Sequence, residues 1–570
     1  MTPALGRRGL GRAAAAVLCA GGVAGLAGLS APPAGASVHG NSWAATATKA
    51  LPLRGARALG ATNPRKMITV RAVLELRDRA ALERRLATNA APLSRSQFEA
   101  RFAPTPQEVA TVRGYLAREG FRQLSVTGNR LLVSATGSVG DVERAFHTSL
   151  RTFRLAGKVV FANTSGAFVP ARLSKTVGAV LGLNDIVALH STLRSTRNTK
   201  PSLTASSGVP QYDVSYQPNQ FAGIYGATAA TPNGHKTSIA IITEGNLTQV
   251  VKDLRIEEKI NHLPQVPVSI VHAGVASPDT SAADEWDMDT QTSTGMAWDV
   301  KRLYLYDATS LTDSDLALAI NKFVSQDVAQ GGSASLGECE TFPYLDGSMF
   351  ADDEAFAEGA VQGQSFFASS GDTGAACAVA PTNGVPDSGL PNVNYPASSP
   401  YVTAVGGTTL LTNSNNSYYN EIAWNAGGGG TSIWETAPYW QNGVVPGSTA
   451  GKGVPDIAMD ADPYSGVTLV MDGTESPGWG GTSLSSPLAL GVWARLETGH
   501  NNRLGMASIA LYKTYGAGSC TSLSLADICS TPAFHDITLG TNGGFVATPG
   551  WDYTTGLGSF DIAPMERLIK

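Results

Sequence analysis

The pattern of hydrophobic and polar positions changes once along the chain, so that two differently built parts are expected. In the first part, β-rich and partly alternating runs such as Met67–Leu76 and Arg122–Val126 are mixed with helical patterns. One helix is expected to begin after Thr105, which heads a capping box, and another near Val142–Leu150. This mixture of short strands and helices predicts a compact α+β domain over residues 67–185.

In the second part, short apolar runs without alternation are separated by helical stretches. Ser238–Thr243, Val268–Val271 and Ser365–Ser369 are apolar enough to be buried strands, and Leu311–Asp327 has a helical pattern. Strands that are apolar throughout, alternating with helices, predict an α/β fold in which a parallel sheet is covered by helices on both faces.

The first 36 residues have the features of an export signal. A basic start containing Arg7 and Arg8 precedes an apolar stretch over residues 13–29 and a small-x-small cleavage signal at residues 34–36. The arginine pair leaves the twin-arginine route open. Because no later uncharged run of about 18 apolar residues appears, we expect a secreted, extracellular protein that makes no membrane contact after residues 1–36 are removed.

Two polar segments and the distribution of charge complete the predicted organisation. Residues 37–66 predict a flexible N-terminal segment, and residues 186–210 predict a linker with a processing site. Residues 1–200 hold 28 Lys and Arg against 9 Asp and Glu, whereas residues 201–570 hold 13 against 37. This asymmetry suggests two parts that attract each other, with a basic tail of no partner role as the alternative. An acidic main body also argues against a nucleic-acid enzyme.

Five cysteines are present, and Cys19 is lost with the signal. The remaining cysteines have no close zinc-type spacing, and their even number favours disulfides in an oxidising exterior. Cys339 with Cys377 would join two loops, and Cys520 with Cys529 would close a short loop, although the pairing stays open.

A small-residue turn, Gly480–Ser483, precedes an apolar run from Leu484 to Leu496 that predicts a helix. The Ser483 hydroxyl would then lie at the positive end of a helix dipole beside exposed backbone N–H groups, which is a favourable position for a nucleophile. Gly-Thr-Ser also occurs in ordinary turns, so the motif alone leaves a structural role open.

Glu285 and Asp289 stand four residues apart in another helical pattern, so both carboxylates share one helix face. Two neighbouring carboxylates do not both ionise readily, and the pair can share a proton and act as a general base in acid. A solvated acidic helix face is the alternative. A calcium loop starting at Asp287 would need Gly at position 292 and Glu at position 298, where Thr292 and Trp298 stand, so that interpretation fails.

Asp372 lies between two glycines, directly after the predicted strand Ser365–Ser369. Loops at the carboxyl ends of parallel strands bind ligands in α/β sheets. Asp372 is therefore either a turn-forming residue or a carboxylic acid directed at a developing oxyanion.

The motifs Glu-x-x-x-Asp, Ser-Gly-Asp and Gly-Thr-Ser-x-Ser-Ser-Pro occur in this order, and with them the chain resembles the sedolisin family of serine-carboxyl peptidases. The resemblance covers almost the whole exported chain and includes Tyr395–Pro400, Gly406–Thr408 and Val454–Ile457. It implies a subtilisin-like parallel sheet with helices on both faces over residues 211–570. An inhibitory activation domain with an α+β, ferredoxin-like fold is implied over residues 67–185.

The resemblance also implies a role for each motif residue. Ser483 would be the nucleophile and Glu285 its general base, while Asp289 would orient Glu285 and share its proton. Asp372 would donate to the oxyanion beside the backbone N–H of Ser483. A carboxyl group donates a hydrogen bond only when it is protonated, so this set of groups favours acid. We therefore expect a monomeric, acid-active peptidase that is made as a zymogen and cleaves proteins or peptides.

One structural Ca²⁺ near the C-terminus is implied by the same resemblance. Asp536 and Asp552 would supply carboxylates, and the carbonyls of Ile537, Thr548 and Gly550 would complete the oxygen shell. Thr548 stands where glycine is usual in the family, but a backbone carbonyl does not depend on its side chain. Two turn-forming aspartates without an ion are the alternative.

Two positions depart from the family pattern. Members of the family often carry a Glu at the end of the first strand of the catalytic domain, where it extends the proton network, whereas here Thr243 precedes Glu244. After the predicted strand Ser333–Leu336, the sequence continues with Gly337–Glu340 where other members carry Trp. We therefore expect differences in the hydrogen bonds around the site and in the substrate subsites.

Other functions remain as alternatives. A subtilisin-type peptidase needs a catalytic histidine, for which His272 is the only loose candidate, and Thr243 occupies the position expected for its aspartate. A secreted binding protein on an inactive hydrolase scaffold is disfavoured because all four catalytic residues are present. The Gly427–Gly430 run lacks the Lys-Ser/Thr of a phosphate loop, so nucleotide binding is not expected.

Charge and linker together give a hypothesis for activation. The basic N-terminal domain would inhibit the acidic catalytic domain until the pH falls, and cleavage within residues 186–210 would follow. The sequence leaves open which bond is cut and which side chains are preferred in substrates. It also leaves open whether the enzyme cuts internally or removes N-terminal tripeptides.

Overall fold

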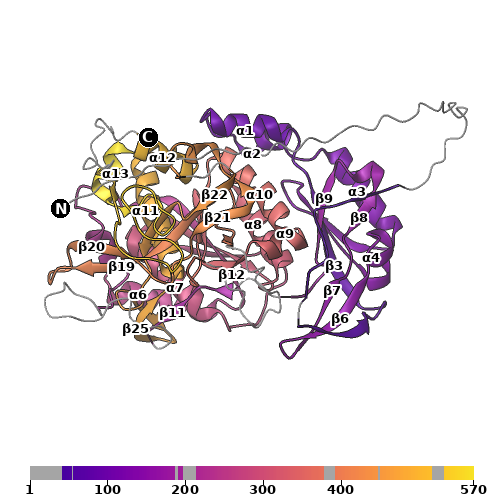
Figure 1. The fold of residues 1–570 in the computed structure, drawn as a ribbon, viewed down its shortest axis with the longest axis horizontal. Helices are drawn as coiled ribbons and strands as arrows, with labels where there is room; N and C mark the ends of the chain where they lie inside the picture. The colour runs from indigo at the N-terminus through magenta and orange to yellow at the C-terminus, as the bar shows by residue number, and fades with distance from the viewer. Residues whose placement is uncertain are drawn as a thin grey trace, which may run out of the picture. The chain divides into compact units, whose positions relative to one another are not determined.

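The structure is a computed structural model that describes residues 42–53, 55–186, 190–196, 214–375, 377, 392–446, 450–516 and 532–570. Figure 1 shows the course of the chain. The predicted export signal, most of the predicted linker, and Cys520 and Cys529 lie outside the described residues. Within those ranges, no helix combines the length and the apolar character needed to cross a membrane.

The N-terminal domain is built on a four-stranded antiparallel sheet with the strand order β4-β5-β3-β9. Its strands are β3 (Met67–Leu74), β4 (Arg122–Val126), β5 (Leu132–Ser138) and β9 (Val177–Leu181). Helix α3 (Pro106–Arg118) lies between β3 and β4 in the sequence, and α4 (Val139–Ala145) follows β5. This βαββαβ succession with the first strand inside the sheet is the ferredoxin-like arrangement, as expected.

Local signals predicted parts of this domain correctly. Thr105 caps α3 through a complete capping box with Glu108, and Ser94 caps α2 (Arg95–Arg101) in the same way. The apolar stripe of α3 is buried against the sheet. The helix predicted for residues 142–150 is wrong at its end, because α4 stops at Ala145 and His147 takes the left-handed backbone conformation with φ 46°.

The segment predicted to be flexible, residues 37–66, contains two strands in its described part. Strand β1 (Trp43–Ala45) pairs with β8 (Phe168–Pro170), and β2 (Arg57–Ala61) pairs with β6 (Leu150–Leu155). The expectation of a loose segment is therefore wrong for these residues. Their partners lie about 100 residues away in the sequence, so composition alone gave no sign of the pairing.

The second part is built on a large sheet with the strand order β13-β14-β12-β15-β17-β19-β20, in which β23 also pairs with β19. All pairs are parallel except β19 with β20. The strands are β12 (Gly234–Glu244), β13 (Val268–His272), β14 (Val300–Ala308), β15 (Gly331–Ala334), β17 (Ser365–Ser369), β19 (Thr403–Thr412), β20 (Tyr418–Ala423) and β23 (Ile457–Asp460). The predicted parallel sheet of buried strands is confirmed.

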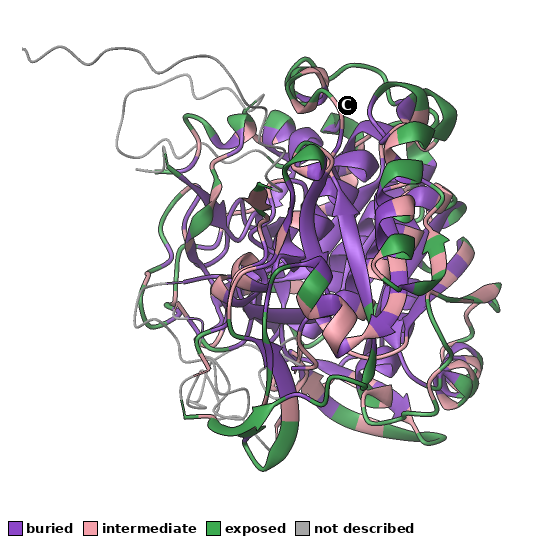
Figure 2. Cartoon of the chain, turned by 90° about the vertical axis from the view of Figure 1, so that its right-hand side faces the viewer, coloured by how far each residue is buried: buried purple, intermediate pink, exposed green. Residues whose placement is uncertain are grey.

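Two groups of helices cover this sheet. Helix α11 (Thr482–Gly499) packs along β12, β15, β17 and β19 and against α7 (Ala283–Ala297), which in turn contacts α6 (Thr248–Ile260). Helices α8 (Asp313–Gln326) and α10 (Ser348–Gln362) pack on each other and on β14 and β17. Figure 2 shows the buried residues along the strands and the inner helix faces, with exposed residues on the outer turns.

Residues of both parts belong to one compact unit, Ser42–Lys570, and make direct contacts across it. Strand β9 and helix α1 (Arg79–Ala87) both contact α10. Arg71 pairs with Asp315 over 2.8 Å, and Arg79 pairs with the buried Glu354. Each pair joins an arginine of the N-terminal domain to a carboxylate of the second part, which is the direction of attraction that the charge asymmetry predicted.

Candidate active site

Ser483 is buried in the first turn of α11, next to Gly481, whose φ of 101° lets the chain turn sharply into the helix. Pro487 stands four residues later and has no backbone N–H, so it cannot donate to the Ser483 carbonyl as a helix normally requires. That carbonyl instead accepts from the hydroxyl of Ser335 over 3.2 Å. The Gly-Thr-Ser-x-Ser-Ser-Pro sequence thus orients the serine at an open helix end.

Glu285 and Asp289 lie one turn apart on α7, and both are buried. Burial raises the pKa of each carboxyl above its usual range, and the Glu285 charge raises the pKa of Asp289 further. The nearby hydroxyls of Ser191 and Ser483 lower the Glu285 pKa in part. The alternative of a solvated acidic helix face is therefore wrong, because the pair faces the serine in the protein interior.

Ser335, between β15 and β16 (Leu336–Cys339), donates to Asp289 Oδ1 over 2.5 Å and lies 3.2 Å from the Ser483 carbonyl. A hydroxyl carries one hydrogen, so only one of these contacts receives it at a time. When Asp289 holds a proton it can donate to Ser335, which then donates to the Ser483 carbonyl. Ser335 therefore connects the carboxyl pair to the start of the serine helix.

Asp372 follows β17 and is buried beside the start of α11. Its Oδ1 accepts from the backbone N–H of Thr482 over 2.9 Å and from the Thr482 hydroxyl over 2.7 Å. Burial raises its pKa to about 6, although Arg194 and Thr482 each act in the opposite direction. Asp372 is thus more than a turn former: its carboxyl lies at the N-terminus of the helix that carries Ser483.

Part of the predicted linker runs through this site as extended chain. Strand β10 (His190–Ser191) pairs with β16, and β11 (Arg194–Ser195) pairs with β25 (Thr474–Gly480). Between them, Thr192 Oγ1 lies 2.7 Å from Ser483 Oγ. Residues 190–191 and 194–195 of the predicted linker are therefore strands, held by strand edges of the second part.

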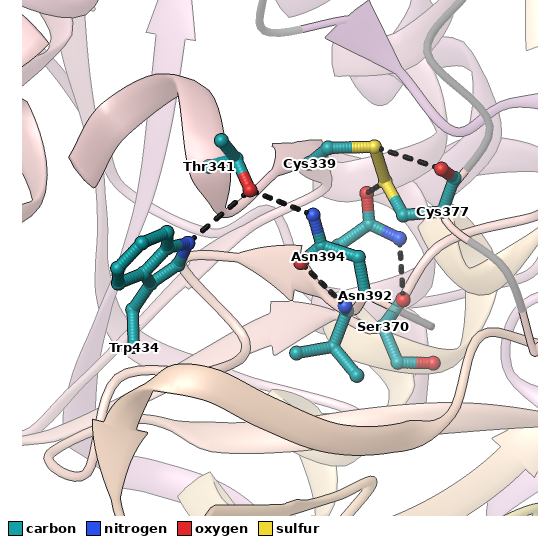
Figure 3. Close-up of a disulfide and its surroundings, with 8 residues drawn as sticks. Cys339, Thr341, Ser370, Cys377, Asn392, Asn394 and Trp434 are labelled. Atoms are coloured by element: carbon teal, nitrogen blue, oxygen red, sulfur yellow. Dashed lines mark hydrogen bonds between the residues drawn. A yellow bond between two sulfur atoms is a disulfide. The ribbon is translucent and has the colours of Figure 1, made fainter. Parts of the chain in front are cut away.

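A disulfide joins Cys339, at the end of β16, to Cys377 in the segment after Asp372 (Figure 3). Beside it, the Asn394 amide donates to the Ser370 carbonyl over 2.8 Å. These contacts attach the Ser370–Asp372 turn to the strand on which the linker segment lies. The proposed Cys339–Cys377 pairing is confirmed, whereas Cys520–Cys529 lies outside the described residues.

The two departures from the family pattern have structural outcomes. Glu244 lies near Asp279 and Asp307, and these charges and burial raise its pKa to about 7. The recorded side-chain partner of Asp289 is Ser335, so a serine occupies the position next to the carboxyl pair. In the Gly337–Glu340 stretch, Glu338 is buried beside Asp313, and burial raises its pKa.

His272 pairs with Asp307 and not with Ser483. Its Nδ1 lies 2.5 Å from Asp307 Oδ2 at the ends of β13 and β14, and half of its side chain is exposed. Among the described residues, the Ser483 hydroxyl bonds to Thr192 Oγ1 and lies close enough to Glu285 to lower the pKa of that carboxyl. This arrangement disfavours a histidine-based mechanism.

The proposed calcium residues lie in two adjoining C-terminal turns. Both carboxylate oxygens of Asp536 accept from the Gly550 N–H, and Asp552 Oδ2 accepts from the Thr548 N–H over 2.9 Å. Burial raises the pKa of Asp536, and the Asp552 charge raises it further. Two carboxylates that repel each other fit a divalent cation. No cluster of three or more His, Cys, Asp or Glu occurs among the described residues, so an ion here would depend on carbonyls such as that of Ile537.

Sequence reasoning missed Ser191, Thr192, Arg194 and Ser335. Ser191 donates to Glu285, and Arg194 Nε donates to Asp372 Oδ2 over 3.2 Å. The first three lie in a stretch whose composition is typical of a linker, so only their proximity to the motif residues identifies them. Ser335 lies within the predicted strand Ser333–Leu336, and that position was the one available signal.

Comparisons with known proteins agree with this architecture. Residues 54–186 match the family described as Pro-kumamolisin, activation domain, and residues 272–514 match the Subtilase family. Sedolisin of Pseudomonas sp. (strain 101) is 37% identical over 574 residues, which cover 94% of this chain and 94% of that protein. Xanthomonalisin of Xanthomonas sp. (strain T-22) is 34% identical over 600 residues, which cover 95% of this chain and 70% of that protein.

A solved structure is also similar. It is Pseudomonas sedolisin (serine-carboxyl proteinase) complexed with two molecules of pseudo-iodotyrostatin, with 37% sequence identity and a TM-score of 0.56. The match covers 62% of this chain and 97% of that chain. The similarity therefore extends over the large sheet and its helices as well as over the sequence.

Proposed function

Because the chain belongs to the sedolisin family of serine-carboxyl peptidases, we propose that it is an exported zymogen that hydrolyses peptide bonds in acid through Ser483. One observation carries the proposal: Ser483, the buried Glu285–Asp289 pair and Asp372 meet at one place, where a stretch of the chain's own N-terminal part lies extended. The activation domain ahead of that stretch makes the chain an inhibited precursor.

Each group has one task in the reaction. Glu285 accepts the Ser483 proton as Ser483 Oγ attacks the substrate carbonyl carbon, and then donates that proton to the leaving nitrogen. Asp289, held by Ser335, orients Glu285 and keeps a shared proton. Asp372 donates to the developing oxyanion, and removal of one such donor typically costs about 3–4 kcal/mol of transition-state stabilisation.

The competent state distributes two protons over three carboxyls: one on Asp372, one on Asp289 and none on Glu285. The three groups influence one another, because the Asp372 charge raises the pKa of Glu285 and the Glu285 charge raises that of Asp289. Protonation of Asp372, whose pKa is about 6, therefore both supplies the oxyanion donor and favours ionisation of Glu285. This coupling acts against burial, which raises the pKa of Glu285 to about 8.

We place the acid-sensitive step of activation at the carboxyl groups around Ser483, in the cleft that residues 190–195 cross. We do not place it in the interface between the N-terminal domain and the second part. Glu354 pairs with Arg79, yet burial still raises its pKa to about 7. A buried carboxyl with a raised pKa favours the assembled precursor in acid, so protonation at this position does not drive release. The N-terminal domain then separates from the second part because the segment that connects them is cut. This changes the activation hypothesis, in which weakened attraction between the two parts came first.

One structural Ca²⁺ is proposed at the C-terminal turns, held by the carboxylates of Asp536 and Asp552 and the carbonyls of Ile537, Thr548 and Gly550. When bound, the ion would neutralise two carboxylates that otherwise repel each other. It would stabilise these turns and take no part in catalysis.

The test is digestion of one unfolded protein of known sequence by the acid-treated precursor, with fragments identified by mass. We expect turnover in acid, loss in Ser483→Ala and Glu285→Gln, and parent-like turnover in the exposed control Glu475→Gln. Internal fragments would indicate an endopeptidase, and successive loss of three residues a tripeptidyl-peptidase. Unchanged turnover in Ser483→Ala would overturn the proposal, and activity peaking near neutrality would favour the histidine mechanism.

A further inference from the structure

The segment in the cleft is held on both sides of Ser483 as a peptide added to two strand edges. On one side, His190 is opposite Gly337 and Ser191 is opposite Leu336, in antiparallel register. On the other, Arg194 is opposite Gly480. Strand addition is a common way for a protein to bind extended peptides. It leaves two residues, Thr192 and Leu193, between the paired stretches and opposite the serine.

The nitrogen of Leu193 lies at the general base. Its N–H donates to Ser191 Oγ over 3.0 Å, and the Ser191 hydroxyl donates to the Glu285 carboxyl. The Leu193 N–H and the Ser483 hydroxyl are both close enough to Glu285 to lower its pKa. In peptide hydrolysis, the base that deprotonates the serine must reach the nitrogen that departs. The strand pairing on both sides and the contact of Leu193 N with Glu285 through Ser191 therefore point to Leu193 N as the leaving nitrogen.

The carbonyl that precedes this nitrogen faces the oxyanion donor. A β-carbon added to Gly481 would lie 2.0 Å from the Thr192 carbonyl oxygen and 2.7 Å from Asp372 Oδ2. Both oxygens thus border the same small space at the start of α11. Thr192 Oγ1 also lies 2.7 Å from Ser483 Oγ, so Thr192 is close to the nucleophile through its side chain and close to Asp372 through its carbonyl.

We infer that the peptide bond between Thr192 and Leu193 is the first bond this enzyme cuts, within its own chain. The inference rests on the proposed function and names the substrate that the site already holds. It also assigns subsites, since the side chains of Ser191 and Thr192 lie on the acyl side and those of Leu193 and Arg194 on the amine side.

The step balances without any co-reactant except water. Ser483 Oγ forms a bond to the Thr192 carbonyl carbon, the bond from that carbon to Leu193 N breaks, and the serine proton passes through Glu285 to Leu193 N. Water then attacks the acyl-enzyme and gives one proton to Glu285, which returns it to Ser483 Oγ. The products are a carboxylate at Thr192 and an amine at Leu193.

The first test follows the intact precursor after a step from about pH 7.5 to about pH 4, two units below the Asp372 pKa. Samples are taken from the earliest times, and each new terminus is identified by mass and by labelling of new amines. We expect the first new N-terminus at Leu193, appearing at a rate that does not depend on protein concentration. A first cut at another bond, or a rate that rises with concentration, would overturn the inference.

Paired variants test the leaving nitrogen. Leu193→Pro removes the N–H that donates to Ser191 Oγ beside Glu285, and we expect self-cleavage at this bond to slow at least about 100-fold. Leu193→Ala keeps the N–H and should be cut near the parent rate. Each substitution is also made with Ser483→Ala and melted at neutral pH, so that a folding defect is detected separately. Equal rates of cutting in the two variants would contradict the assignment.

Failure of this inference can be distinguished from failure of the proposed function. If the acid-treated parent digests an unfolded protein while Ser483→Ala does not, the peptidase stands even when the first self-cut lies elsewhere. If neither digests it, the proposed function itself fails.

Discussion

Arg194, in the segment that crosses the cleft, donates from Nε to the buried Asp372 Oδ2 over 3.2 Å and from Nη2 to the Asp372 carbonyl over 3.3 Å. The residue proposed to stabilise the oxyanion is thus bound by the chain that the site would cut. A carboxylate paired with a guanidinium is ionised, and an ionised carboxylate cannot donate a hydrogen bond. Protonation of Asp372 ends the ion pair and creates the donor at once.

Replacing Arg194 should therefore let the precursor cut itself at higher pH. Arg194 lowers the pKa of Asp372, so Arg194→Met leaves Asp372 protonated to higher pH. Among the described residues, Glu285 and the N–H and hydroxyl of Thr482 also face Asp372, and these are unchanged. We expect the pH at which self-cleavage is half-maximal to rise by about one unit. The exposed Arg57→Met removes the same charge from the N-terminal domain and should leave this pH in place.

An amide at position 372 should separate the donor role from pH. Asp372→Asn keeps a hydrogen-bond donor at every pH, so activity should extend toward neutrality, and the limb of the rate profile near pH 6 should disappear. Asp372→Ala has no donor and should lose roughly 10²–10³ in kcat at all pH values. If both variants showed the same profile, Asp372 would not be the donor.

Ser335 is a positioning residue whose loss should change the pH profile. The Ser335 hydrogen bond lowers the pKa of Asp289. In the pH–rate profile of Ser335→Ala, the limb that reports the titration of Glu285 and Asp289 should therefore move to higher pH. We expect kcat to fall about tenfold with KM unchanged, since no substrate contact is lost. The control is Ser333→Ala, which removes a buried hydroxyl that contacts Ser486 over 2.8 Å and not Asp289. An unshifted profile in Ser335→Ala would contradict the positioning role.

The assembled precursor should lose stability as the pH rises. Burial raises the pKa of Glu358 to about 8, while the amide of Asn129 in the N-terminal domain donates to it over 2.6 Å. A raised pKa in the folded state stabilises that state below the ordinary carboxyl pKa, and this contribution is lost as pH rises through about 8. The thermal midpoint of Ser483→Ala precursor should accordingly fall between about pH 5 and pH 9.

Glu358→Gln in the same background tests this prediction. The neutral amide should raise the midpoint above neutrality by about 2–4 °C and change little near pH 5. Gln362 can accept the new N–H, because its buried Oε1 has no recorded partner. The exposed Glu475→Gln should change neither value. A midpoint of Glu358→Gln that tracks the parent across this range would show that Glu358 is ionised in the precursor.

Removal of calcium should destabilise the C-terminal turns. A chelator is expected to lower the thermal midpoint of Ser483→Ala precursor by about 2–4 °C, and added Ca²⁺ to restore it. Asp552→Asn should melt lower than the parent and no longer respond to the chelator. Chelator-insensitive melting of the parent would leave Asp536 and Asp552 as turn-forming residues.

The sequence by itself determined the features that depend on near neighbours. The capping boxes at Ser94 and Thr105, and the placing of Glu285 and Asp289 on one helix face, all involve residues three or four positions apart. The apolar runs of the parallel sheet were visible for the same reason, since burial on both faces excludes polar residues from a whole strand.

The tertiary structure decided how distant segments meet. Ser335 reaches Asp289 only because β15 lies next to β12, and Arg194 reaches Asp372 only because β11 adds to the edge of β25. The linker has the composition of an unstructured segment, and its order comes from backbone hydrogen bonds to strands almost 150 and 300 residues away. Such pairing uses the backbone that every residue shares, so composition does not reveal it.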